Sequence, residues 1–230
     1  MIDTATDDAV VALSANGQTS VRISHEKASH SGVLFSHIDS VLKETGITVR
    51  DLNLIGTGIG PGSFTGIRIA VSTARMLAQL LKLPLAGLHS QYLYAVSLPA
   101  QNGEYILSAF DAKKSRVFGG LYRKTESRLD IIAEPKDYFP DELLTFIPEG
   151  SAVQGCGDGA EKFKELFSAQ HRFTMHTDFT PSPSQMAAAF EQFFIENREQ
   201  CADITATVPF YARKSDAEVL MLQRTGLARG

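Results

Sequence analysis

The sequence predicts an α/β protein built from two similar lobes, and three observations lead to this prediction. Short apolar runs and helical segments in the first half alternate in the order βββαβαβα. An aspartate turn and a glycine turn occur in the same order in each half of the chain. The 230 residues suit two small domains, and a composition of 43% hydrophobic and 21% charged residues is typical of globular proteins.

Three antiparallel strands are expected at the N-terminus. The first strand begins at Met1 and ends at Asp3, so either the start codon is assigned late or this lobe tolerates a clipped central strand. Asn16 and Gly17 both tolerate positive φ and predict a hairpin turn between the next two strands. These two strands are expected over residues 10–13 and 19–23.

Two helices, two strands and a short helix are expected to complete the first lobe. Apolar residues at helical spacing predict the first helix, which stops at Gly46. The remaining expected elements are a strand at 54–59, a long helix at 65–82, a strand at 85–88 and a short helix ending at Val96. The resulting order resembles the ribonuclease H-like lobe of actin, sugar kinases and Hsp70 ATPase domains, known together as the ASKHA fold.

The second half repeats landmarks of the first. Phe110-Asp111 mirrors Ile2-Asp3, and Gly155-Cys-Gly-Asp-Gly159 mirrors Gly58-Ile-Gly-Pro-Gly62. A duplicated lobe explains this order, although two short turns could also match by chance. We therefore expect an N-terminal lobe at 1–99, a linker at 99–103 and a C-terminal lobe at 104–230. A last helix at about 214–230 is a candidate to pack back on the first lobe.

Charge and cysteine content narrow the possible functions. The formal net charge of −4 argues against a chain that grips tRNA by itself, although a local basic patch remains possible. Only two cysteines are present and they form no C-x-x-C pair, so zinc and redox sites have little support. We expect a cytoplasmic protein, since no signal peptide and no apolar run of about 18 residues is found.

The glycine turn before the long helix has two interpretations. Its glycines allow close backbone approach, and Ser63 or Thr65 could cap the helix, whose free N–H groups could bind an anion. The alternative is a tight turn without a ligand, and the P-loop pattern is absent. Asp7 and Asp8 would repel a phosphate unless a metal ion lay between them. The weak candidates for nucleotide or anion binding are Asp3, Gly60, Gly62, Ser63, Asp111 and Lys113.

The long helix carries two apolar stripes separated by a polar strip. One stripe is expected to face the lobe's own sheet, so the other should contact something else. Another subunit is the favoured occupant, and the second lobe or a neighbouring helix is the alternative. The first helix is expected to share this surface. The candidate interface residues are Leu34, Phe35, Ile38, Ile69, Ser72, Thr73, Met76 and Leu80.

The run Gly60-Pro-Gly-Ser-Phe-Thr-Gly-Ile-Arg-Ile69 closely resembles the signature of the TsaB family, also called YeaZ. Weaker landmarks follow in the family's order: Ile2-Asp3-Thr4, Pro84-Leu-Ala-Gly87, Phe110-Asp111-Ala-Lys-Lys, Gly157-Asp-Gly, Pro181-Ser-Pro-Ser and Pro209-Phe-Tyr-Ala-Arg213. The short N-terminus departs from the family, which usually has several more apolar residues before the aspartate.

The resemblance implies a two-lobed protein without a known active site of its own. It would pair through helices of its N-terminal lobe with the catalytic subunit TsaD, and the ATPase TsaE would join them. TsaD transfers threonylcarbamoyl to the adenosine beside the anticodon of tRNA. Without TsaD, homodimers through the same surface are expected, and contact with tRNA is expected to be indirect.

Enzymatic alternatives find little support in the residues. Where TsaD carries two metal-binding histidines, the corresponding positions here are Ser90 and Tyr94, and His89 lacks a partner at i+4. No metal and no cofactor are therefore expected. Cys156 at a helix start is a weak candidate nucleophile, since no base is apparent. The alternatives that remain are an independent ASKHA-type ATPase or kinase and, with less support, an M22-type metallopeptidase.

Overall fold

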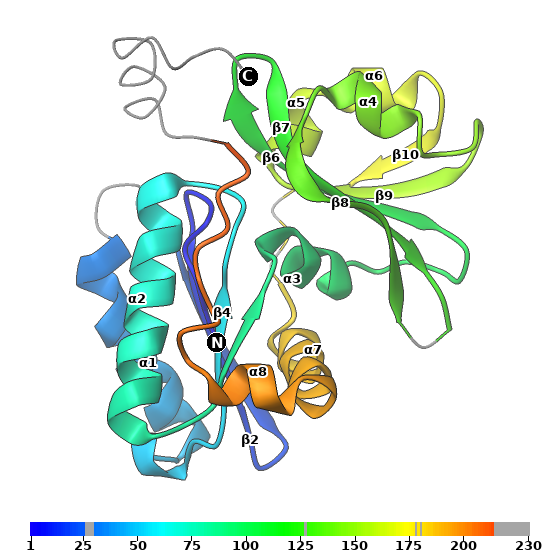
Figure 1. Cartoon of the computed structure of the whole chain (residues 1–230). Coiled ribbons are helices and arrows are strands. Elements are labelled where there is room, and N and C mark those ends of the chain that lie inside the picture. The colour runs from blue at the N-terminus through cyan, green and yellow to red at the C-terminus, as the bar shows by residue number, and fades with distance from the viewer. Residues whose placement is uncertain (26–29, 127, 178, 180, 214–230) are drawn as a thin grey trace, which may run out of the picture.

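The structure is a computed structural model of the whole chain, and it describes residues 1–25, 30–126, 128–177, 179 and 181–213. It has two lobes, each built on a five-stranded mixed sheet (Figure 1). No helix in these described ranges is long and apolar enough to cross a membrane.

The first sheet has the order β3-β2-β1-β4-β5. The first three strands pair in antiparallel fashion, and β1 pairs with β4, and β4 with β5, in parallel. β1 has two residues. The strands are β1 Ile2–Asp3, β2 Ala9–Ala15, β3 Gln18–Ser24, β4 Ile55–Gly58 and β5 Leu85–Leu88.

Helices cover both faces of this sheet. α1 and α2 pack together on one face, where Val41 and Ala70 bury against Ile2 and Val11. The expected order of elements is confirmed, and α2 begins one residue earlier than predicted. The helices of the N-terminal half are α1 His30–Thr45, the 3₁₀ turn η1 Val49–Asp51, α2 Phe64–Leu81 and α3 Ser90–Ser97.

The second sheet repeats the first. Its order is β10-β9-β6-β7-β8, which matches the first sheet strand for strand when each lobe is counted from its own first strand. Its elements are β6 Tyr105–Lys113, β7 Arg116–Lys124, β8 Leu129–Tyr138, α4 Pro140–Leu144, β9 Ala152–Cys156, α5 Asp158–Lys162, α6 Lys164–Ser168 and β10 Arg172–Met175. The duplicated ribonuclease H-like fold is therefore confirmed.

The two lobes exchange helices. α3 follows the first sheet in the chain but packs against β6, β7 and β8 of the second. α7 (Pro183–Glu196) and α8 (Arg198–Ala202) follow the second sheet but pack on the first (Figure 1). α3 and α7 contact each other between the lobes.

The expected C-terminal lobe at 104–230 therefore includes helices that pack on the first sheet. Residues 183–202 belong to the first lobe because Phe190 of α7 lies over Gly56 of β4, where a Cβ would be 2.9 Å from its ring. Gly56 has no side chain, so the Phe190 ring packs directly on the backbone of the first sheet. The expected helix at 214–230 lies outside the described residues.

Candidate functional site

The glycine turn packs tightly against the turn that follows β1. A Cβ on Gly62 would lie 2.1 Å from the Ala5 carbonyl oxygen, and one on Gly66 would lie 1.8 Å from that of Thr4. The Ser63 N–H donates to the Ala5 oxygen at 2.6 Å, and Thr4 Oγ1 donates to the Gly66 oxygen at 2.6 Å. The close approach of the two backbones therefore requires glycine at both positions, and this explains the two glycines without a bound ligand.

Several polar groups of the glycine turn and of the start of α2 are bonded within the protein. Ser63 caps the helix, as one sequence interpretation predicted, because its Oγ accepts from the Gly66 N–H at 3.3 Å. The Gly60 N–H donates to Ser90 Oγ at 3.2 Å, and the Gly60 oxygen accepts from the Ser90 N–H at 3.0 Å. His89 Nδ1 lies 3.1 Å from the same oxygen. The Gly60 N–H is therefore engaged within the protein and unavailable to a phosphate.

Asp3 is a buried carboxyl at the end of the central strand. Its Oδ1 accepts from the Ala5 N–H at 2.7 Å, while Oδ2 has no hydrogen-bond partner among the described residues. Burial raises the pKa of Asp3 to about 6. Asp3 does not line the cavity between the lobes, so the structure separates it from most of the other candidate anion-binding residues.

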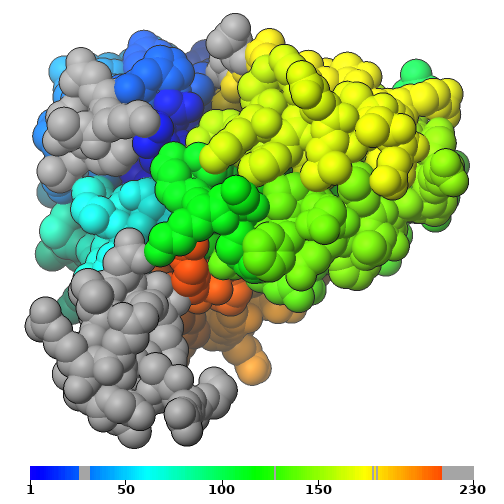
Figure 2. Space-filling model, turned by 90° about the horizontal axis from the view of Figure 1, so that it is seen from above, coloured from blue at the N-terminus to red at the C-terminus, as the bar shows by residue number. Residues whose placement is uncertain are grey.

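A cavity of about 390 Å³ lies between the lobes. The turns after β1 and around β6–β7, the start of α2 and the segment 210–213 surround it, and Figure 2 shows the green β6–β7 region beside the cyan start of α2 and the red-orange segment. Of the candidate anion-binding residues, Gly62, Ser63, Asp111 and Lys113 line this cavity.

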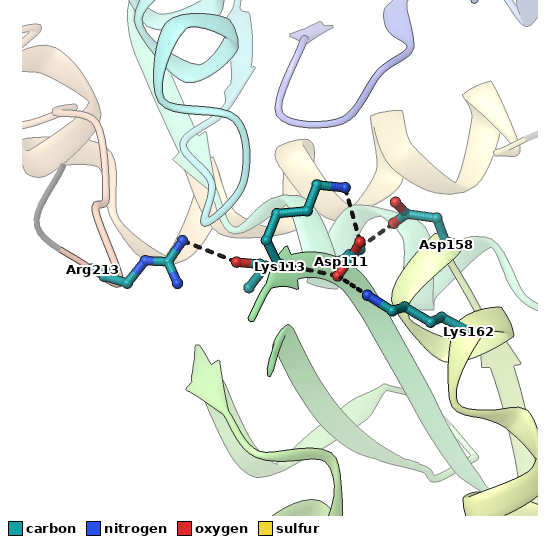
Figure 3. Close-up of polar contacts among 6 residues, drawn as sticks. Asp111, Lys113, Asp158, Lys162 and Arg213 are labelled. Carbon is teal, nitrogen blue, oxygen red and sulfur yellow. Dashed lines mark hydrogen bonds and ion pairs between the residues drawn. The ribbon is translucent and has the colours of Figure 1, made fainter. Parts of the chain in front are cut away.

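Asp111, which lines the cavity, is paired with two lysines (Figure 3). Asp111 accepts from Lys113 Nζ at 2.8 Å and from Lys162 Nζ at 3.0 Å, and its N–H donates to Asp158 Oδ1 at 2.9 Å. Burial alone would raise the pKa of Asp111, but the hydrogen bonds from Lys113 and Lys162 outweigh it and lower the pKa to about 2. The Lys113 ammonium is therefore paired, which weakens its case as a phosphate ligand.

The structure makes Cys156 a poor nucleophile. Cys156 is fully buried, and burial raises the pKa of its thiol to about 12, so the thiolate is scarce at neutral pH. Burial lowers the pKa of His89. His25 Nδ1 lies 2.6 Å from an Asp8 oxygen. Across the described ranges, no group of three or more histidine, cysteine, aspartate or glutamate side chains could hold a metal ion.

The two-stripe interpretation of α2 agrees with the burial of its side chains. The stripe expected to face the sheet is inside, with Ile67, Ala70, Val71, Ala74 and Ala78 buried. On the opposite side, Met76 and Leu80 are 41% and 72% exposed, and Phe35 of α1 is 53% exposed. We call these three residues the apolar ridge. Ser72 is exposed and Thr73 is half-buried, and the half-buried Ile38 and Ile69 pack against the core between the helices and the sheet.

One candidate interface residue is wrong. Leu34 is fully buried in the core with Val11, Val41 and Ala70, so it cannot contact a partner. Helical spacing shows that α1 has an apolar face. Because α1 packs both on the sheet and against α2, the inner residues of that face are buried in these contacts.

The sequence analysis missed the role of residues 203–213, which we call the strap. The strap returns along the first lobe, where the Phe210 N–H donates to the Ile59 oxygen at 2.8 Å. It then reaches the second lobe, where Arg213 Nη2 donates to the Ala112 oxygen at 2.9 Å (Figure 3). Tyr211 stacks on Phe64 with ring centroids 4.6 Å apart. The only available signal was the landmark Pro209-Phe-Tyr-Ala-Arg213.

The sequence of this chain is similar to those of known proteins of tRNA threonylcarbamoyladenosine biosynthesis. A family model described as TsaD, tRNA N6-adenosine threonylcarbamoyltransferase, matches residues 23–222. The tRNA threonylcarbamoyladenosine biosynthesis protein TsaB of Escherichia coli is 32% identical, over 86% of this chain and 90% of that protein. TsaB of Bacillus subtilis is 26% identical, over 87% of each chain.

A solved structure shares the fold. It is an uncharacterized Pseudomonas aeruginosa protein with similarity to peptidase YEAZ, with a TM-score of 0.76, 22% identity, and coverage of 92% of this chain and 97% of that one. The extent of the family-model match and the identity to the E. coli protein decide the family. The chain therefore belongs to the TsaB (YeaZ) family of tRNA threonylcarbamoyladenosine biosynthesis proteins.

Proposed function

We propose that this chain is a non-catalytic subunit that binds and activates a TsaD-like catalytic subunit, together with a TsaE-like ATPase, in the cytoplasm. The complex would transfer threonylcarbamoyl to the adenosine beside the anticodon of tRNA. The observation that carries the proposal is the apolar ridge of Phe35, Met76 and Leu80 on adjacent helices (Figure 1). Burying a large apolar side chain contributes about 1.5–3 kcal/mol, so the ridge can supply much of an interface.

The chemistry of the candidate catalytic groups supports a role without an active site. The Cys156 thiol is buried and protonated, and Asp111 pairs with Lys113. The Gly60 N–H is bonded to Ser90. We therefore propose that the chain works without a resident metal or cofactor, and that any ATP is used by the partner complex.

The test is complex formation with the catalytic subunit of the same organism. Wild-type chain and catalytic subunit should co-elute in size-exclusion chromatography, and Met76→Glu should weaken the complex by at least about tenfold, because a carboxylate would be buried in an apolar contact. The matched control is Ile195→Glu, since Ile195 is also exposed but lies on α7. Both variants should melt within a few degrees of wild type. Absence of the wild-type complex would refute the proposal.

The interlobe cavity favours one second candidate, an independent ATPase, since turns from both lobes surround it. Calorimetry with Mg-ATP on the isolated chain separates the two functions. Micromolar affinity with turnover supports the ATPase, and the absence of heat supports the partner subunit.

A further inference from the structure

A second cavity, of about 640 Å³, lies between helix α7 and the edge strand β8 of the second sheet. The start of α3 and the end of β5 complete its walls, and α3 lies between the second sheet and α7 (Figure 1). Small-molecule sites in proteins have volumes of about 300–1,000 Å³. This cavity shares no lining residue with the one that contains Asp111 and Lys113. We call it the α7 cavity.

The walls of the α7 cavity are largely aromatic and aliphatic. Tyr92 of α3 and Tyr122 of β7 meet edge to face, with ring centroids 5.6 Å apart and an angle of 65° between the rings. Ile131 lies directly across from Tyr122 on β8 and is 49% exposed. Phe193 lines the cavity from α7 and is half-buried. A flat aromatic ring packs well among such side chains, because offset and edge-to-face contacts between rings are favourable.

His89 supplies a hydrogen-bond acceptor in the wall of the α7 cavity. Its Nδ1 lies 3.1 Å from the Gly60 oxygen. A carbonyl oxygen only accepts, so Nδ1 carries the proton and Nε2 keeps its lone pair. Burial lowers the pKa of His89, so the ring is neutral at pH 7. Nε2 forms no hydrogen bond with any residue that the structure describes, so it is free to accept from an N–H of a ligand.

The charged groups of the α7 cavity disfavour an anion. Within the described part of the chain, its charged lining residues are Arg128, Asp130 and Glu196. Arg128 Nε donates to Asp130 Oδ1 at 2.9 Å, so this cation is paired. Glu196 adds a second carboxylate, which accepts from Gln192 Nε2 at 2.5 Å. A phosphate or carboxylate would therefore meet an excess of negative charge, whereas an uncharged ring would not.

We propose that the α7 cavity binds a small, uncharged, planar heteroaromatic molecule that carries a ring N–H, as indole does. The ring packs against Tyr92, Tyr122 and Phe193, and its N–H donates to His89 Nε2. Because both lobes contribute walls, a bound ligand stabilises the contact between them. The site is separate from the apolar ridge, and it does not depend on the proposed function.

Indole fluorescence measures this binding directly, because the chain contains no tryptophan. Titration of the whole chain into indole should give a saturable blue shift of the indole emission, with a Kd of about 0.1–1 mM. N-methylindole keeps the rings but lacks the N–H. It should bind about three- to tenfold more weakly, and this comparison isolates the bond to His89 without altering the protein.

Filling the cavity tests its position. Ala189 lines the cavity from α7 and is half-buried, so the new ring of Ala189→Phe should occupy the cavity and weaken indole binding by at least about tenfold. Ala188→Phe is the matched control, because Ala188 is the neighbouring residue on the same helix and is exposed. It should bind indole as wild type does. Thermal melting shows whether both variants fold.

Each outcome decides the inference. Saturable binding that Ala189→Phe removes and Ala188→Phe keeps supports it. Absence of saturable binding to wild type overturns it, as does binding that Ala189→Phe leaves unchanged. If Ala189→Phe does not fold, the comparison of the two indoles decides, and equal affinity for both overturns the role of His89 and the ligand class with it.

ATP, added as a competitor, separates this site from a nucleotide site. ATP should not displace indole, because the Arg128 cation is already paired with Asp130. Displacement would show that the cavity takes an anionic nucleotide and would overturn the inference. None of these results bears on complex formation with the catalytic subunit, which co-elution tests separately.

Discussion

Replacing Gly66 by alanine tests whether the glycine signature is a packing device. The new methyl group would lie 1.8 Å from the Thr4 carbonyl oxygen and 3.2 Å from Ser63 Cβ. The first of these atoms belongs to the backbone, so no side chain can swing away. An ordinary carbon–oxygen contact is about 3.3 Å or longer, so the two turns would have to separate by more than about 1 Å.

The loss in free energy of unfolding can be estimated from the contacts that such a separation breaks. The bonds from Thr4 Oγ1 to the Gly66 oxygen and from the Ser63 N–H to the Ala5 oxygen are both 2.6 Å long. Each buried donor or acceptor left unsatisfied costs about 1–3 kcal/mol, and overpacking costs about 1–3 kcal/mol. Alanine recovers about 1 kcal/mol of helix propensity. We expect Gly66→Ala to reduce the free energy of unfolding by about 4 kcal/mol and the melting temperature by about 10 °C.

Urea unfolding followed by circular dichroism measures this loss. Gly32→Ala is the matched control, because Gly32 lies in α1 with no atom within 4 Å of an added Cβ, and it should be neutral or stabilising. Wild-type stability in Gly66→Ala would refute the packing argument. Unchanged stability combined with loss of Mg-ATP binding would instead restore the phosphate-loop interpretation.

Three further predictions follow from buried groups. The folded pKa of Asp3 is raised to about 6 from 3.8, so its contribution to stability is full below pH 3.8 and is lost as the pH rises through 6. Between pH 4 and pH 7, the free energy of unfolding of Asp3→Asn should therefore rise by about 2–3 kcal/mol relative to that of wild type, as measured by urea unfolding. A difference between the two proteins that does not change with pH would contradict this. Cys156 and Cys201 are both buried, so a thiol reagent at pH 8 should label neither in the native chain and both in denaturant; rapid native labelling would count against it. Phe190→Ala should lower the free energy of unfolding by about 3–5 kcal/mol and speed amide hydrogen exchange in the first lobe. Faster exchange in the second sheet alone would show that α7 had been assigned to the wrong lobe.

Local patterns predicted the elements well because their causes are local. The Asn16-Gly17 turn, the Ser63 cap and the inner stripe of α2 depend on backbone conformation and on helical period, and the structure contains all of them. The duplicated order of turns also predicted the second lobe correctly, because each lobe repeats one sequence of strands.

Local sequence patterns do not predict contacts between segments that are far apart in the sequence. Nothing in the residues near Leu34 says that α1 covers the sheet as well as α2, so a buried residue was assigned to the partner surface. The exchange of α3 and α7 depends on which sheet each helix meets after the chain crosses between lobes. Gly56 and Phe190 pack together across more than a hundred residues of sequence, and neither residue alone signals the other.

The sequence by itself determined the element order, the duplicated lobes and, through Gly60 to Ile69, the family. Only the tertiary structure decided what the glycines contact, which residues remain exposed on α1 and α2, and how Tyr211 holds Arg68. The physical reason is that periodicity and turn preference act over a few residues, whereas burial and charge pairing depend on segments brought together by the completed fold.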